Sequence, residues 1–161
     1  MKRTIYRLFF VGLLAAGMSG CSTNKTTSSY ITTETECLGV ELDGSQTLYA
    51  WGTGRSKNDA VEQAKKNAIR DVLFKGIRGG SQECNTRPLV AEVNAQERYE
   101  SYFNQFFKDN GEYTRFVNMS DTRRRTYEKQ ENKYEFKYGA TIRVLRSELR
   151  QKLLSDNILK Q

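Results

Sequence analysis

Three cysteines, Cys21, Cys37 and Cys84, carry the most distinctive chemistry in this 161-residue chain. The chain contains no histidine, which excludes histidine general bases, Ser-His-Asp triads and zinc sites built on imidazole. Three cysteines are also too few for a four-cysteine metal site. No carboxylate pair or nucleophile motif is recognisable, so we expect no catalytic residue, no metal ligand and no small-molecule substrate.

Cys21 lies at the end of a sequence that is typical of a secretion signal. A positively charged start precedes an apolar run of eleven residues, 8–18, which is too short to span a bilayer. Residues 18–21, with the sequence MSGC, resemble the bacterial lipobox. The resemblance implies that residues 1–20 are a signal peptide and that Cys21 receives a diacylglyceryl group and an N-acyl chain, with no other cofactor. The alternatives are an ordinary signal peptide with a chance cysteine and a buried N-terminal helix.

The segment that follows is interpreted as a tether. Residues 21–35 are rich in serine and threonine and show no apolar period, as in a flexible linker. Ser22 stands where an aspartate would favour the inner membrane, and no acidic cluster follows, so the resemblance to sorted lipoproteins favours the periplasmic face of the outer membrane. Removal of residues 1–20 lowers the formal charge from +7 to +4, and we therefore expect no nucleic-acid partner.

Residues 36–161 predict a single α+β domain, in which helices pack on one face of a mainly antiparallel sheet. The expected order of elements is β-β-α-α-β-β-β-α. The predicted strands are residues 37–42, 47–52, 112–118, 123–130 and 133–145. The predicted helices begin near Ser56 and at Pro88, and a short closing helix contains Leu149 and Leu153.

The first predicted strand alternates, so that Leu38, Val40 and Leu42 share one face that we expect to be buried. Asp43 and Gly44 follow it and predict a type I′ hairpin turn, because both central positions of that turn need positive φ. The second strand then returns beside the first.

A glycine pair lies between the second strand and the first helix. Gly52 and Gly54 match neither a Walker loop nor a dinucleotide fingerprint, since Lys57 stands where a third glycine is needed. We interpret them as a tight turn that brings the helix close to the sheet. The helix carries alanine at every fourth position: Ala60, Ala64 and Ala68.

Residues 48–73, LYAWGTGRSKNDAVEQAKKNAIRDVL, resemble small outer-membrane lipoproteins of the LPP type, which include flagellum-associated lipoproteins. The shared pattern is a hydrophobic strand, a Gly-x-Gly turn and a helix with regularly spaced alanines, and residues 138–144 match the closing strand of the family. The resemblance implies the fold more than a function. The chain departs from the family in the loop around Cys84 and in an aromatic helix, so we carry over no flagellar role and expect an uncharacterised subgroup.

Cys37 and Cys84 are the two thiols that remain once Cys21 is lipidated. An exported chain reaches an oxidising compartment, where an even number of cysteines favours a disulfide. Two buried free thiols and a reactive pair are the alternatives, although no histidine is present to activate a thiol.

A basic run, Arg123, Arg124 and Arg125, lies among aromatic residues in the predicted strand region. One interpretation is a site that contacts a partner or an anionic surface. The other is a solvated edge strand, whose charges prevent it from pairing with strands of other molecules.

Aromatic residues are concentrated between residues 99 and 138. Core packing explains their spacing, and a platform that stacks on sugars is the alternative. Phe103, Phe106 and Phe107 do not share one line of a helix, so we expect one of them to contact a partner.

These features lead to three functional hypotheses. The leading one is a non-catalytic, lipid-anchored envelope protein whose domain binds another envelope protein or a second copy of itself. The second is a cell-wall or glycan-binding module that uses the basic run and the aromatic residues. The third is a small envelope hydrolase.

Overall fold

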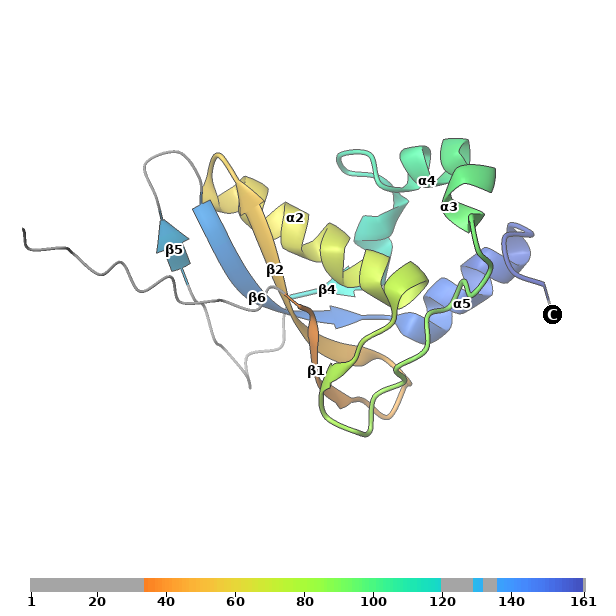
Figure 1. Cartoon of the computed structure of the whole chain (residues 1–161), viewed down its shortest axis with the longest axis horizontal. Coiled ribbons are helices and arrows are strands. Elements are labelled where there is room, and N and C mark those ends of the chain that lie inside the picture. The colour runs from red at the N-terminus through yellow and green to blue at the C-terminus, as the bar shows by residue number, and fades with distance from the viewer. Residues whose placement is uncertain (1–33, 120–128, 132–135, 161) are drawn as a thin grey trace, which may run out of the picture. The chain divides into compact units, whose positions relative to one another are not determined.

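The computed structural model describes residues 34–119, 129–131 and 136–160, all within one unit of the chain, Thr32–Gln161 (Figure 1). The predicted signal peptide, Cys21 and the basic run Arg123–Arg125 lie outside the described residues. Thr35, at the end of the predicted tether, is buried, and its hydroxyl donates a hydrogen bond to Asp71 Oδ2. Thr35 therefore makes contacts within the folded domain, although it belongs to the predicted tether.

The described strands form one mixed sheet in the order β3-β1-β2-β6-β4, with β5 also paired to β6. Only β1 and β3 are parallel; the other pairs are antiparallel. The strands are β1 Glu36–Val40, β2 Gln46–Gly54, β3 Gly79–Gly80, β4 Val117–Asn118, β5 Lys129–Glu131 and β6 Phe136–Val144. The predicted α+β class is confirmed, although the short β3 had no counterpart in the expected order of elements.

The helices lie on one side of the long β2–β6 pair, and α5 continues beyond the end of β6 (Figure 1). The helical elements are α2 Lys57–Arg70, the π-helical turn η1 Asp71–Lys75, α3 Ala95–Arg98, α4 Glu100–Phe106, the 3-10 helix η2 Glu112–Phe116 and α5 Arg146–Ser155. The predicted strand at residues 112–118 is therefore mostly wrong, since only its last two residues pair in the sheet. No described helix combines the length and apolar character needed to cross a bilayer.

The central layer forms where α2 packs on β2 and β6. Ser56 caps the helix, because its hydroxyl accepts a hydrogen bond from the Asp59 N–H while the Asp59 carboxylate accepts one from the Ser56 N–H. A Cβ built on Gly52 would lie 2.0 Å from Ala60 O and 2.3 Å from Ala64 N. The predicted glycine turn and alanine face thus bring two backbones closer together than any larger residue allows.

Two expectations for the first hairpin are wrong. Cys37 is the buried residue of β1, whereas Val40 is 39% exposed and Leu42 is fully exposed, because the register shifts between Cys37 and Gly39. The turn is also not type I′. Gly44 has a φ of 78° but Asp43 is not among the residues with positive φ, as in a three-residue loop that ends in a left-handed glycine.

The second predicted helix starts later than Pro88. The Leu89 and Val90 N–H groups donate to the carbonyls of Val72 and Leu73 in η1, so these two donors are used outside any helix of their own. These bonds satisfy acceptors that the π-helical turn leaves free. The helical residues begin at Ala95 instead.

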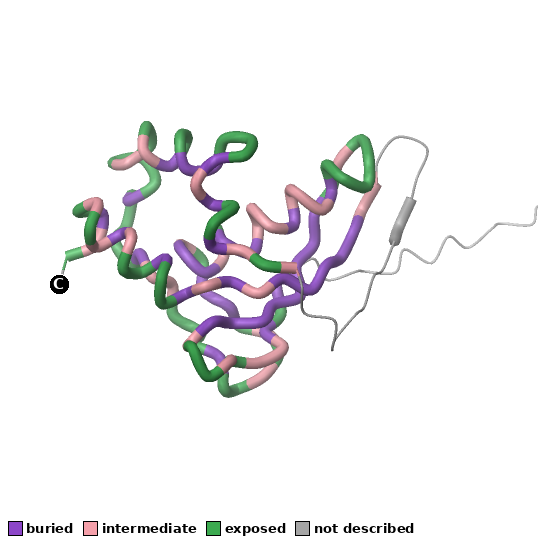
Figure 2. Tube along the Cα trace, turned by 180° about the vertical axis from the view of Figure 1, so that it is seen from behind, coloured by how far each residue is buried: buried purple, intermediate pink, exposed green. Residues whose placement is uncertain are grey.

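The aromatic residues of α4 and η2 form core rather than a surface patch. Phe103, Phe106 and Phe107 are all buried, so the expectation that one of them contacts a partner is wrong. The reason is that α4 ends at Phe106, which frees Phe107 from the helical line and places it against Tyr113 and Arg70. Buried residues follow β2, β6 and the inner sides of the helices (Figure 2).

Candidate functional site

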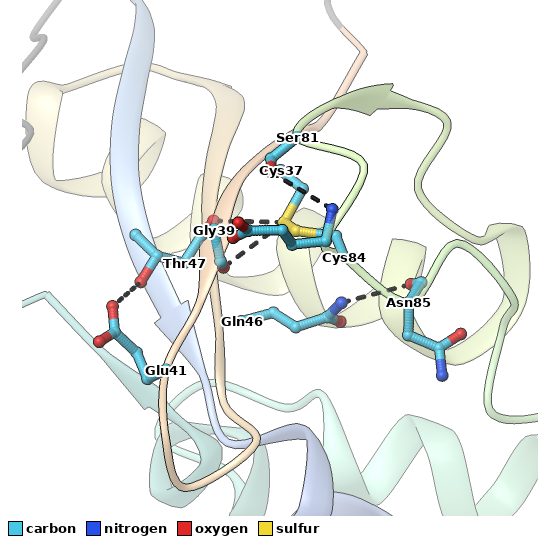
Figure 3. Close-up of a disulfide and its surroundings, with 9 residues drawn as sticks. Cys37, Gly39, Glu41, Gln46, Thr47, Ser81, Cys84 and Asn85 are labelled. Atoms are coloured by element: carbon cyan, nitrogen blue, oxygen red, sulfur yellow. Dashed lines mark hydrogen bonds between the residues drawn. A yellow bond between two sulfur atoms is a disulfide. The ribbon is translucent and has the colours of Figure 1, made fainter.

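Cys37 and Cys84 come together at the edge of the sheet, where the loop after the first helix meets β1 (Figure 3). Their Cα atoms are 6.3 Å apart although they are 47 residues apart in the sequence, a separation that a disulfide spans. Both side chains are buried. The spatial pairing that the sequence predicted is therefore confirmed.

Backbone contacts fit the loop to β1 around this cysteine pair. The Ser81 N–H donates to Cys37 O at 2.7 Å, and Gly80, with a φ of 97°, lies so close that a Cβ there would be 2.0 Å from the same oxygen. One residue after the pair, Asn85 O accepts a hydrogen bond from Gln46 Nε2 at 3.3 Å. The cysteines thus hold the loop where its carbonyls reach the start of β2.

The same loop forms one wall of an open depression of about 280 Å³ at the end of the β2–β6 pair. The other walls are the β1–β2 turn and the first turns of α5. Its lining residues include Gln46, Asn85, Arg146, Ser147 and Arg150. We call this hollow the α5 depression.

Arg146 is the most unusual residue of the α5 depression, because only 9% of it is exposed and no described carboxylate forms an ion pair with it. Its Nη2 donates to Arg87 O at 2.7 Å, but its Nη1 is enclosed and has no partner. Gln46 Oε1, in the same lining, is also enclosed without a donor. Burial lowers the pKa of the Arg146 guanidinium, as expected for a desolvated cation.

The start of α5 adds unsatisfied donors to this depression. Its N-cap residue, Leu145, provides no side-chain hydrogen bond to the first turn. Arg146 and Arg150 are one turn apart, so two like charges share a face close to the positive end of the helix. Ser147 lies beside them, and its Oγ would be 2.6 Å from a Cβ built on Gly44. Glu83 is the carboxylate that lines the opposite wall.

A larger depression of about 440 Å³ lies between the first helix and α3–α4. Its lining combines Phe74 and Phe103 with the carboxylates Glu97 and Glu100. The Arg70 guanidinium lies over the Phe107 ring at 4.8 Å from its centroid and so already has an aromatic partner there.

Other residues that attracted attention in the sequence have structural roles. The turn with Gly52 and Gly54 is filled by α2, since a Cβ on Gly54 would lie 2.5 Å from Asp59 Cβ, and the capping box already uses donors of the first turn. Within the described residues, no cluster of three or more potential metal ligands occurs. Sequence reasoning missed the α5 depression, for which the Arg-x-x-x-Arg spacing at residues 146–150 was the available signal.

Comparison of the chain with protein-family models, with curated proteins and with solved structures gives no match. The resemblance to small outer-membrane lipoproteins stays a prediction from the sequence.

Proposed function

We propose that this protein is a lipid-anchored, non-catalytic component of the bacterial outer membrane, facing the periplasm, whose α+β domain binds another envelope protein or a second copy of itself. The observation that supports the proposal is the pairing of Cys37 with Cys84 at disulfide distance. A structural disulfide needs an oxidising compartment, which agrees with the export signal that ends at Cys21.

The lipid on Cys21 is the proposed membrane anchor. One acyl chain binds a bilayer weakly, whereas two or more hold a protein there stably. The serine- and threonine-rich residues that follow would then separate the domain from the lipid surface.

Two further points favour binding over the alternatives. The described aromatic side chains Phe103, Phe106 and Phe107 pack in the core, so they do not support a sugar-stacking platform. The chain has no histidine and no recognised nucleophile motif, which gives a hydrolase little support.

The anchor is tested with Cys21→Ala and a matched control, Ser22→Ala, which keeps the lipidated cysteine. After a high-salt wash, the wild-type protein and Ser22→Ala should stay with outer-membrane fractions, and Cys21→Ala should be released. Metabolic labelling with a fatty-acid analogue should mark the first two proteins only. If Cys21→Ala stays in the membrane fraction, the anchor is not this lipid.

The binding role is tested by crosslinking in intact cells, followed by mass spectrometry. Exposed lysines of the domain, such as Lys75 and Lys108, should give reproducible crosslinks to one envelope protein or to a second copy. The Cys21→Ala protein, released from the membrane, serves as the control and should lose those crosslinks. Equal crosslinks to many abundant proteins from both forms would contradict a specific interaction.

A further inference from the structure

We propose that the α5 depression is a binding site for an oxyanion, the carboxylate or phosphate group of a small ligand, with Arg146 and Arg150 as its cationic residues. The site is separate from the proposed lipid anchor and does not involve Cys21.

The first reason is the unpaired charge of Arg146. A buried guanidinium normally has a carboxylate or several acceptors around it, because an uncompensated buried cation is costly. Here one carbonyl, Arg87 O, accepts from Nη2, while Nη1 is left without an acceptor. An oxyanion supplies both the missing charge and the missing acceptor, and a guanidinium donates to such groups through two parallel hydrogen bonds.

The second reason is the position of both arginines on α5. Cations near a helix N-terminus oppose the helix dipole, and like charges one turn apart repel each other. Arg146 begins the helix and so opposes the dipole, Arg150 is one turn further and repels Arg146, and neither forms an ion pair with a described carboxylate. An anion at the uncapped first turn would be attracted by both guanidinium groups and by the positive end of the helix, which offsets the two unfavourable interactions, and the Ser147 hydroxyl adds a donor in the lining.

The third reason concerns the kind of ligand. Gln46 Oε1 is an enclosed acceptor without a donor, in the same lining as Arg146. A ligand that carries an N–H or O–H beside its oxyanion satisfies both groups at once. Ser147 and Arg150 are exposed, so their side chains can move when such a ligand enters the depression.

The test uses the full chain as purified from cells, in detergent micelles, with inorganic phosphate and acetate as probes. Each probe is compared with chloride at equal ionic strength, and the thermal midpoint and the NMR shifts of the Ser147 and Glu148 amides are followed. Phosphate, acetate or both should raise the midpoint and move these amides; the more effective probe identifies the oxyanion. No effect of either probe relative to chloride overturns the proposal.

Variants separate a specific site from general salt effects. Arg150→Gln, at an exposed position, should keep the fold and weaken binding of the effective probe about tenfold, which corresponds to about 1.4 kcal/mol. Arg55→Gln is the matched control, since this exposed arginine precedes the capped N-terminus of α2 at the other end of β2. Arg55→Gln should bind as the wild type does. Equal binding by Arg150→Gln, or equal loss in both variants, would contradict the site.

Discussion

Replacement of Gly52 by alanine tests the contact on which the whole central layer depends. The added Cβ would lie 2.0 Å from Ala60 O and 2.3 Å from Ala64 N, whereas ordinary contacts of a Cβ are 3.4–4 Å. Both neighbours are backbone atoms, so no side-chain rotation relieves the overlap. The helix α2 must move away from β2 by more than 1 Å at these two positions.

The expected cost follows from what this movement disrupts. Ala60, Ala64 and Ala68 are completely buried on the side of α2 that packs on β2 and β6, so a displaced helix loses contacts along its entire inner face. Overpacking of a core costs about 1–3 kcal/mol, and the contacts with backbone place Gly52→Ala at the upper end, about 3 kcal/mol. For a domain of this size we expect the thermal midpoint to fall by about 10 °C.

Urea unfolding followed by circular dichroism measures the change, and Gly79→Ala provides a matched control. Gly79 also lies in a strand, but a Cβ there would meet only the flexible Glu36 Cγ at 3.4 Å. The control should change the free energy of unfolding by less than about 0.5 kcal/mol. If Gly52→Ala and Gly79→Ala unfold at the same urea concentration, α2 does not pack on β2 in the way described.

Three other predictions follow from named contacts. In the denatured, unreduced mature protein, neither Cys37 nor Cys84 should react with an alkylating reagent. Reduction of the bond between them should lower the free energy of unfolding by about 4 kcal/mol. Two reactive thiols would contradict the bond. Ser56→Ala should cost about 1 kcal/mol through loss of the capping box, measured by urea unfolding with the exposed Ser101→Ala as control. Burial opposes the ionisation of Asp156, but hydrogen bonds from Lys152 and Tyr102 outweigh it and hold its pKa below the ordinary value. This contribution to stability is therefore present above the ordinary carboxylate pKa and should be lost as the pH falls through the lowered one; Asp156→Asn should flatten urea midpoints measured across that acidic range.

Local sequence signals predicted the strand-turn-helix unit well, because each of its parts is specified by neighbouring residues. The capping box needs only Ser56 and Asp59, and the helix needs only its regular alanines. The helix α2 then packs on the long closing strand β6, whose alternation made it the clearest strand in the sequence. Here local preference and tertiary packing agree.

The errors occur where distant residues decide the structure. The pattern of β1 favours burial of Leu38, Val40 and Leu42, yet Cys37 is the residue that is buried. It lies against Cys84, which is 47 residues further along the chain. Pro88 is a good helix start, but the next two N–H groups donate to carbonyls of the π-helical turn, and the helix begins only at Ala95. Neither influence is visible in a short sequence window.

Arg146 shows the same limit at the candidate site. In the sequence it is one of many basic residues, and it lies at the start of a helix that the spacing of Leu149 and Leu153 predicts. Its single acceptor is the carbonyl of Arg87, which lies 59 residues earlier in the sequence, in the loop that follows Cys84.

The cysteine pair and the α5 depression are therefore parts of one arrangement. Cys84 ties the loop to β1, and the next residues of that loop, Asn85 and Arg87, present the carbonyls that accept from Gln46 and Arg146. A loop held only by backbone hydrogen bonds would let those two side chains turn toward solvent, where their polar atoms find water. A disulfide between Cys37 and Cys84 would instead keep Gln46 Oε1 and Arg146 Nη1 enclosed without partners in the lining of the depression, which is the state that an oxyanion with an adjacent donor group can satisfy.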